Sequence, residues 1–341
     1  MNSRPDSFTD HFVDSSELGK EGLSRLVHRA LELSAGASPR QYPGSRIAAL
    51  FFNPSLRTRS SMEFAASAVG ATLVTLSSGQ GLWQIEHRNG AVMNEDKAEH
   101  IAEVAGVLSE MAQVLALRTF AGLQDPEMDL SDQILSSFIH HASKPVINLE
   151  SALWHPLQGI ADTATWVNHL GSPQGKRITL TWAPHPKALP TAVANQVLLS
   201  AALQGMNITL AHPKPFDLPK TVIQRCSTLA TREGGSLRIT HDPKEAYSGA
   251  QVVVAKSWSG VQGYGNRFAE TQLRKSYSDW MVTAEKMQHT DSAGFMHCLP
   301  VRRNVVVSDE VLDSPSSWTH YTAGMRMWTA MALLEQMLER Q

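Results

Sequence analysis

Short apolar runs alternate with amphipathic stretches along the chain, and this pattern predicts an α/β protein. Residues 47–52 form an apolar run that Asn53-Pro54 ends. A helical pattern follows and stops near Gly70, and residues 72–76 form a second apolar run. A strand, a helix and a strand within about 30 residues make a βαβ unit, so we expect a parallel sheet.

The same alternation continues to the end of the chain and predicts two domains. Strands are expected at residues 114–117, 145–149, 178–182, 207–212, 237–240, 252–255 and 295–299. Residues 79–97 are expected to be an irregular loop, with a helix from about residue 99. The predicted fold class is therefore α/β, with two doubly wound parallel-sheet, Rossmann-like domains. We place the first domain at residues 1–150 and the second at 151–322. The last helix, near 325–339, belongs to a segment 323–341 that returns to the first domain.

Composition narrows the possible partners and the cellular location. The chain has 341 residues, a formal net charge of -2 and only two cysteines, Cys226 and Cys298. A nucleic-acid footprint would need a basic excess, and a disulfide framework would need more cysteines. No apolar run reaches the ~18 residues of a membrane span, and the first ten residues lack the pattern of a signal peptide. We therefore expect a cytoplasmic protein with no nucleic-acid or membrane partner.

The residues after the first predicted strand have the chemistry of an anion site. Ser55, Arg57, Thr58 and Arg59 follow a buried strand and open a helix. Backbone N–H groups and the helix dipole favour an anion there, and arginine matches phosphate geometry. The spacing alone fits equally well a capped helix with two solvated arginines.

Three other segments supply compatible groups at the ends of predicted strands. They are Arg118, His155-Pro156-Leu157-Gln158, and His297-Cys298-Leu299-Pro300 followed by Arg302. Ligands of open parallel sheets bind beyond the carboxyl ends of the strands, so these segments could converge. Taken singly, each has a structural alternative: a surface ion pair, a histidine that only packs, or a small core cysteine.

Taken together, residues 51–59, 155–158 and 297–300 resemble three motifs of the aspartate/ornithine carbamoyltransferase family. These are the Ser-x-Arg-Thr-Arg phosphate motif, the His-Pro-x-Gln motif that contacts the carbamoyl group, and the ornithine-branch His-Cys-Leu-Pro motif. The resemblance covers nearly the whole chain. It implies carbamoyl phosphate as a substrate, a homotrimer with active sites between subunits, and no metal or organic cofactor.

The resemblance also implies a role for individual residues. The carbamoyl phosphate-binding set is Ser55, Leu56, Arg57, Thr58, Trp83, Arg118, His155, Pro156, Leu157, Gln158, Cys298, Leu299 and Arg326. Within this set, the catalytic residues are Arg57, Arg118, His155, Gln158 and Cys298. Trp83 would come from a neighbouring subunit. Arg326 follows Ala323-Gly324-Met325 where the family usually has Glu-Asn, so its sequence context departs from the pattern.

Departures from the ornithine motif indicate the second substrate. Residues 254–260 read Val-Ala-Lys-Ser-Trp-Ser-Gly where ornithine enzymes carry Asp-x-x-x-Ser-Met-Gly. This is similar to the branch that uses ornithine acylated on its α-nitrogen. The implied acylornithine-binding residues are Ala98, Glu150, His185, Lys256 and Arg302.

Two positions favour N-succinylornithine over N-acetylornithine. The acetyl type has the pattern Asp-x-Glu-Glu-His at residues 96–100, and Ala98 takes the place of its first glutamate. Val306 stands where the acetyl type carries a lysine. Succinyl adds a carboxylate, and two carboxylates ~4 Å apart repel by roughly 1 kcal/mol in water and by more in a shielded site. Alanine is also a tolerated residue at a helix start, so N-acetylornithine stays open as the alternative substrate.

The predicted activity is transfer of the carbamoyl group of carbamoyl phosphate to the δ-amine of N-succinyl-L-ornithine, in arginine biosynthesis. A nucleotide-dependent dehydrogenase is a rival, but the turn at residues 183–187 has no glycine fingerprint. A second rival is an inactive paralogue that only binds carbamoyl phosphate. The three intact motifs weigh against it.

Overall fold

The computed structural model describes residues 11–79 and 81–340, and the chain divides into two compact units. Unit 1 comprises Met1–Ala121, Glu127–Ile160 and Met325–Gln341. Unit 2 comprises Gly122–Pro126 and Ala161–Gly324. Two long helices, α6 (Pro156–Leu170) and α12 (Thr319–Leu338), each contain one of the points of division.

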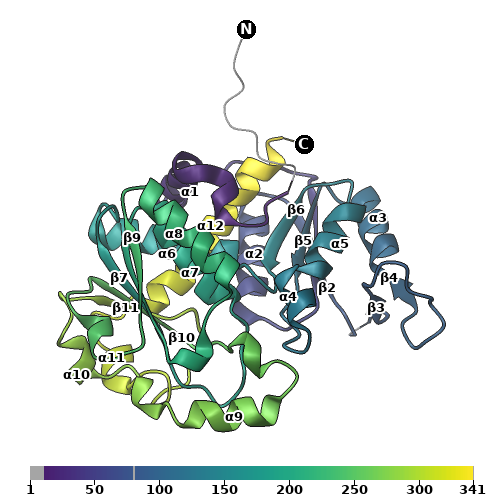
Figure 1. Cartoon of the computed structure of the whole chain (residues 1–341). Helices are drawn as coiled ribbons and strands as arrows, with labels where there is room; N and C mark the ends of the chain where they lie inside the picture. The colour runs from purple at the N-terminus through teal and green to yellow at the C-terminus, as the bar shows by residue number, and fades with distance from the viewer. Residues whose placement is uncertain (1–10, 80, 341) are drawn as a thin grey trace. The chain divides into compact units, whose positions relative to one another are not determined.

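Unit 1 is built on a parallel sheet of four strands in the order β2-β1-β5-β6 (Figure 1). Its strands are β1 (Arg46–Phe51), β2 (Thr72–Ser77), β5 (Val114–Arg118) and β6 (Val146–Glu150). Every residue of β5 and β6 is buried, as expected for a parallel sheet covered on both faces. Parallel pairing of β1 with both β2 and β5 confirms the βαβ prediction.

The helices of unit 1 begin and end where the sequence changes character. They are η1 (Ser15–Leu18), α1 (Gly19–Ser34), α2 (Leu56–Ala68), α3 (Ile101–Met111), α4 (Pro126–Leu130) and α5 (Gln133–His141). Gly70, with φ at +71°, follows α2 and adopts the left-handed conformation that ends a helix. Helices α3 and α5 lie side by side and pack Ile101, Leu135 and Phe138 against the strands (Figure 1).

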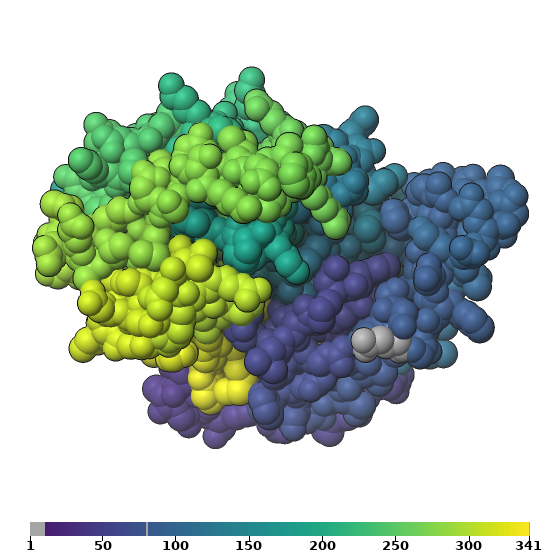
Figure 2. Space-filling view, turned by 90° about the horizontal axis from the view of Figure 1, so that it is seen from below, coloured from purple at the N-terminus to yellow at the C-terminus, as the bar shows by residue number. Residues whose placement is uncertain are grey.

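The segment expected to be irregular contains a small parallel sheet. Strand β3 (Ile85–Glu86) pairs with β4 (Glu99–His100), so α3 begins at Ile101 and not at about residue 99. The buried Glu86 carboxylate accepts hydrogen bonds from Arg88 and pairs with Lys97. These bonds, led by those from Arg88, hold the pKa of Glu86 well below its usual range. The loop between β3 and β4 projects from the rest of unit 1 (Figure 1), and blue atoms of this part of the chain stand out at one side in Figure 2.

Unit 2 contains a second parallel sheet, with the strand order β11-β10-β7-β8-β9. Its strands are β7 (Arg177–Trp182), β8 (Asn207–Ala211), β9 (Ser236–Thr240), β10 (Val252–Lys256) and β11 (Gly294–Met296). The predicted strand at residues 295–299 is wrong in its second half. Strand β11 ends at Met296, and Leu299, with φ at +52°, lies outside the extended region.

Helices flank this second sheet and complete a doubly wound unit, as predicted (Figure 1). They are α6, α7 (Ala192–Leu203), η2 (Lys214–Phe216), α8 (Lys220–Arg232), η3 (Glu245–Tyr247), η4 (Val261–Gly263), α9 (Arg267–Lys275), η5 (Ser278–Trp280), α10 (Ala284–Met287) and α11 (Asp309–Leu312). All residues of α7 are buried. Among residues 11–79 and 81–340, no helix is long and apolar enough to cross a membrane.

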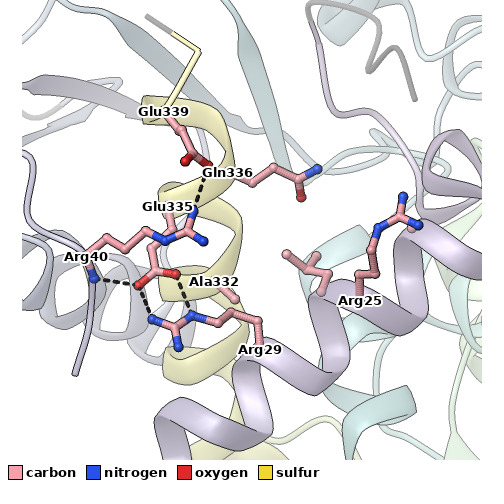
Figure 3. Close-up of a pocket in the computed structure, with 9 residues that line it drawn as sticks. Arg25, Arg29, Arg40, Ala332, Glu335, Gln336 and Glu339 are labelled. Carbon is pink, nitrogen blue, oxygen red and sulfur yellow. Dashed lines mark hydrogen bonds and ion pairs between the residues drawn. The ribbon is translucent and has the colours of Figure 1, made fainter. Parts of the chain in front are cut away.

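The carboxyl-terminal part of α12 packs beside α1 within unit 1 (Figure 1). Glu335, 2% exposed, accepts hydrogen bonds from Arg29 Nε at 2.7 Å and Nη2 at 2.9 Å, and from the Arg40 backbone N–H. Figure 3 shows these bonds at the edge of a cavity of about 240 Å³, with Arg40 reaching Glu339 as well. The ion pairs fix the position of α12 on α1, and the same helix carries Arg326 into unit 1.

Candidate active site

The amino-terminus of α2 is the first part of the candidate site. Strand β1 ends at Phe51, and Ser55 caps α2 with its Oγ accepting the Thr58 backbone N–H at 3.1 Å. The connection is held by Asn53, whose Oδ1 accepts the Phe120 N–H at 2.7 Å. A capped helix start directs backbone N–H groups and the positive end of the helix dipole outward, which favours an anion.

Two buried guanidinium groups meet at the Thr58 hydroxyl. Arg118 Nη1 and Arg326 Nη2 each lie 3.0 Å from Thr58 Oγ1. Arg326 Nη1 also donates to Gln158 Oε1 at 2.8 Å. The exposed fractions of Arg118 and Arg326 are 5% and 2%. Residues from β5, α2, α6 and α12, far apart in the sequence, therefore form one cationic cluster within unit 1.

Glu150 balances part of this positive charge. Its Oε2 lies 2.5 Å from Arg118 Nη1 and 3.3 Å from His155 Nε2. Arg118 and Glu150 end the neighbouring strands β5 and β6, and His155 precedes α6. A buried charge needs a partner and further hydrogen bonds: Glu150 is the charge partner of Arg118, and Thr58 accepts a hydrogen bond from it. Among the described residues, Arg118 Nε still has no hydrogen-bond acceptor.

Six predicted residues of unit 1 thus come together near the carboxyl ends of β1, β5 and β6: Thr58, Arg118, Glu150, His155, Gln158 and Arg326. Pro156 and Leu157 open α6 and are buried beside His155. Arg59 takes another direction, because it bonds Ser77 Oγ and lies over the Phe51 ring.

Two predicted residues of unit 1 lie on its surface. The Trp83 side chain is 70% exposed, and Ala98 is exposed just before β4. Among the described residues, no hydrogen bond or ion pair joins Trp83 or Ala98 to the cationic cluster. Their predicted roles at a substrate therefore stay predictions.

The predicted residues after β11 belong to unit 2. His297 is buried, and its Nδ1 accepts the Leu299 N–H at 2.9 Å. The free cysteine Cys298 is half-buried. Leu299 combines φ at +52° with a cis peptide bond to Pro300, and left-handed non-glycine residues are often found at functional sites. The expected approach of these residues to the cluster of unit 1 stays a prediction.

The remaining predicted residues of unit 2 are mostly cationic. Lys256 ends β10, is 8% exposed, and donates from Nζ to the Ser257 carbonyl at 3.0 Å. Burial lowers the pKa of His185 to about 4, the Lys187 carbonyl opposes this shift, and the charges of Lys256, Arg274 and Arg302 add to it. Neutral His185 beside fixed positive charges suits the recognition of a carboxylate.

One buried ion pair of unit 2 was missed by the sequence analysis. Glu270 and Arg274 lie one turn apart on α9 and are 3% and 2% exposed. A glutamate four residues before an arginine is the pattern of an ordinary surface helix pair, so their spacing gave no indication of burial.

A buried carboxyl of unit 1 was also missed. Asp132 accepts hydrogen bonds from Ser151 Oγ and the Ala152 N–H. These two donors belong to the segment that precedes His155. Burial raises the pKa of Asp132 to about 6. No motif marks this residue. Among the described residues, no cluster of three or more histidine, cysteine or carboxylate side chains could hold a metal ion.

Comparison with known proteins agrees with this geometry. Residues 10–168 match the aspartate/ornithine carbamoyltransferase carbamoyl-P binding domain, and residues 174–337 match the Asp/Orn binding domain of the same family. N-acetylornithine carbamoyltransferase of Xanthomonas campestris pv. campestris is 40% identical, over 90% of this chain and 91% of that protein. N-succinylornithine carbamoyltransferase of Bacteroides fragilis is 35% identical, over 85% of this chain and 86% of that protein.

A solved structure shows the same relationship in three dimensions. It is a variant of N-acetyl-L-ornithine transcarbamylase with one glutamate replaced by alanine, complexed with carbamyl phosphate and N-succinyl-L-norvaline. The TM-score is 0.93 at 38% sequence identity, covering 96% of this chain and 99% of that one. The two domain matches and these similarities show that the chain belongs to the aspartate/ornithine carbamoyltransferase family, and that it resembles the N-acylornithine branch within it.

Proposed function

We propose that this protein transfers the carbamoyl group of carbamoyl phosphate to the δ-amine of an N-acylated L-ornithine, releasing phosphate. The observation that carries the proposal is the buried cluster at the start of α2, where Arg118 and Arg326 meet at Thr58. Buried guanidinium groups gathered at a helix start provide donors that suit a doubly charged phosphate.

The phosphate is held by the first turn of α2. Ser55, the Leu56 backbone N–H, Arg57 and Thr58 supply neutral and charged donors from one short segment. Arg326 bonds the Thr58 hydroxyl from α12, and this contact supports including it in the phosphate site despite its altered sequence context. Glu150 offsets the charge of Arg118, and the helix dipole of α2 adds to the attraction for an anion.

The carbamoyl oxygen is polarised by Arg118, His155 and Gln158. When the δ-amine attacks the carbamoyl carbon, negative charge develops on this oxygen, and donors already in place stabilise it. Phosphate departs and takes up the amine proton, so no protein nucleophile is required. Cys298 and Leu299 orient the amine and the carbamoyl group, and catalysis rests on positioning.

Glu150 has two roles in this proposal. Its predicted contact is with the acylornithine. Its Oε2 also orients Arg118 and His155 within unit 1. A single carboxylate would thus connect the donors of the carbamoyl site to the second substrate.

We favour succinyl as the acyl group. Ala98 is exposed and small, so it leaves space for the succinyl carboxylate. Alanine also carries no negative charge that would repel this carboxylate. The alanine-for-glutamate variant of the acetylornithine enzyme, complexed with N-succinyl-L-norvaline, supports this physical argument. Acetyl is the second candidate, because the reported acetylornithine relative is more similar to this chain than the succinylornithine relative.

We further propose a homotrimer in the cytoplasm, in which Trp83 completes the site of a neighbouring subunit. The Trp83 ring is 70% exposed, and Leu56, Phe64 and Val74 of unit 1 are also at least half-exposed. Exposed large apolar side chains are consistent with a surface that another chain covers, although only a contiguous patch would mark one.

The proposal is tested by giving the purified protein carbamoyl phosphate with ornithine, N-acetylornithine or N-succinylornithine. Citrulline products and released phosphate are measured together. We expect a substituted citrulline from the acylated substrates, with the succinyl compound preferred. Preference for free ornithine would contradict the proposal, and binding of carbamoyl phosphate without any turnover would indicate a paralogue that only binds it.

A further inference from the structure

Helix α9 contributes a buried ion pair to unit 2. Arg274 Nε donates to Glu270 Oε2 at 3.0 Å, and Nη2 pairs with Oε1. The Arg274 guanidinium also lies 5.8 Å from the ring centre of Trp182 and 5.5 Å from that of Phe216. A buried pair enclosed by aromatic rings has one geometry, because a planar guanidinium fixes the direction of each of its donors.

The pair joins two segments that are distant in the sequence. Arg274 Nη1 donates to Ser257 Oγ at 2.9 Å and lies 3.4 Å from the His185 carbonyl. Its Nη2 donates to Ser259 Oγ at 3.2 Å. One guanidinium thus contacts the segment after β7, which carries His185, and the segment after β10, which directly follows Lys256.

Glu270 and Ser259 complete the connection. Ser259 Oγ donates to Glu270 Oε1 at 2.9 Å and accepts the Leu189 N–H at 3.2 Å. The Ser259 N–H in turn donates to the Leu189 carbonyl at 2.9 Å. The ion pair, one serine and two backbone hydrogen bonds therefore fix the spacing between the two segments.

The distribution of charge indicates a ligand-positioning role. Glu270 is occupied by Arg274 and Ser259, whereas Lys256 donates to a neutral carbonyl. The Glu270–Arg274 pair is therefore neutral overall, and Glu270 does not cancel the positive charge of Lys256. A carboxylate paired directly with Lys256 would remove the attraction for an anionic substrate.

We propose that the Glu270–Arg274 pair is a positioning clamp that sets the distance between His185 and Lys256, and thereby determines the affinity for the carboxylate-bearing amine substrate. This inference rests on the proposed function for the identity of that substrate. It assigns no contact between Arg274 and the substrate. The phosphate-binding residues proposed at the start of α2 belong to unit 1, whereas the clamp belongs to unit 2, so we expect carbamoyl phosphate binding to depend little on it.

The first test is Arg274→Lys, which keeps the charge and loses the fork that reaches two serines. We expect KM for the N-acylornithine to rise about tenfold or more, with KM for carbamoyl phosphate changed less than about twofold. Arg232→Lys is the matched control, because Arg232 lies on α8 with its side chain 66% exposed and bonds only the neighbouring Glu233 among the contacts that the structure gives it.

A second variant separates positioning from folding. Glu270→Leu/Arg274→Met replaces the whole pair by apolar groups, a change that buried ion pairs often tolerate. We expect its melting temperature to stay near that of the wild type while the KM for the N-acylornithine stays raised. A wild-type KM in this stable double variant would overturn the inference.

Failure of the proposed function would give a different result from failure of the clamp. In that case the wild type would carbamoylate neither acylated ornithine. Hydrogen exchange at the Leu189 and Ser259 amides would then still test whether the Glu270–Arg274 pair holds the two segments together. We expect faster exchange in Arg274→Lys than in Arg232→Lys, and equal protection in the two variants would contradict the clamp.

Discussion

The two units organise their charged residues in different ways. In unit 1, Arg118 and Arg326 converge on one hydroxyl at a helix start, so the charges themselves form the proposed binding site. In unit 2, the buried charges of Glu270 and Arg274 neutralise each other, and the pair is proposed to position Lys256 and His185 without contacting the ligand. A site for an invariable phosphate can be built from direct contacts, whereas a site that selects among amines depends on how its loops are spaced.

The largest expected effect is on the direct contacts of unit 1. Arg118→Gln removes a charged donor proposed to stabilise the developing oxyanion, and leaves Glu150 without its closest partner. We expect kcat to fall by about 10²–10³-fold in steady-state assays. Arg46→Gln is the control, since Arg46 starts β1 on the exposed side of unit 1. Near-normal kcat in Arg118→Gln would show that the two units do not divide the work as proposed.

A smaller effect is expected where the second substrate is chosen. Ala98→Glu adds a carboxylate at an exposed position, so the fold should be preserved. We expect kcat/KM for N-succinylornithine to fall by about tenfold relative to that for N-acetylornithine, through charge repulsion. Ala98→Gln has nearly the same shape without the charge and should leave the ratio almost unchanged. Equal effects of glutamate and glutamine would point to size instead of charge.

The free energy of unfolding should depend on pH through Asp132, whose carboxyl is bonded by the segment before His155. The pKa of Asp132 is raised by burial to about 6, so the folded protein binds more protons than the unfolded chain between pH 4 and 6. This stabilising contribution is complete below the unfolded pKa and is lost as the pH rises through about 6. The wild type should therefore lose about 1–3 kcal/mol relative to Asp132→Asn between pH 4 and 7.

Chemical denaturation at several pH values measures this difference. Asp291→Asn is the control, because the Asp291 side chain is 57% exposed and lies 3.9 Å from Arg177. Its stability should follow the wild type across the same pH range. Parallel curves for the wild type and Asp132→Asn would mean that Asp132 titrates normally.

The smallest expected effect is in unit 2, where His185 should not change its protonation state near neutral pH. Burial lowers the pKa of His185 to about 4, so the ring is neutral throughout the range from pH 5.5 to 8. KM for the N-acylornithine should then show no inflection near the ordinary histidine pKa of ~6.5. NMR titration of the His185 ring provides the direct check. An inflection near pH 6.5 that disappears in His185→Gln would contradict the described environment.

Local patterns explain what the sequence could predict. The run before Asn53, the cap at Ser55 and the stop at Gly70 depend on neighbours within one turn or strand, so the βαβ unit was predictable. The predicted gathering of side chains in unit 1 followed from a general rule about the ends of parallel strands. Thr58 and Arg118 required no information beyond that rule.

Other features depend on contacts that no local pattern contains. Residues 297–299 look like the continuation of a strand, but Leu299 turns into the left-handed region. Strands β3 and β4 have two residues each and are too short for periodicity to reveal. The burial of Glu270 with Arg274 is decided by Trp182 and Phe216, which are far away in the sequence.

The central claim is most directly tested by following the carbamoyl carbon itself. Carbamoyl phosphate labelled with ¹³C would be incubated with the protein and N-succinylornithine, with N-acetylornithine and with free ornithine, and the products observed by NMR. We predict that the label appears as the ureido carbon of a substituted citrulline, fastest with the succinyl substrate, with one phosphate released per label transferred. Label found only in hydrolysed carbamoyl phosphate, or transferred fastest to free ornithine, would contradict the account.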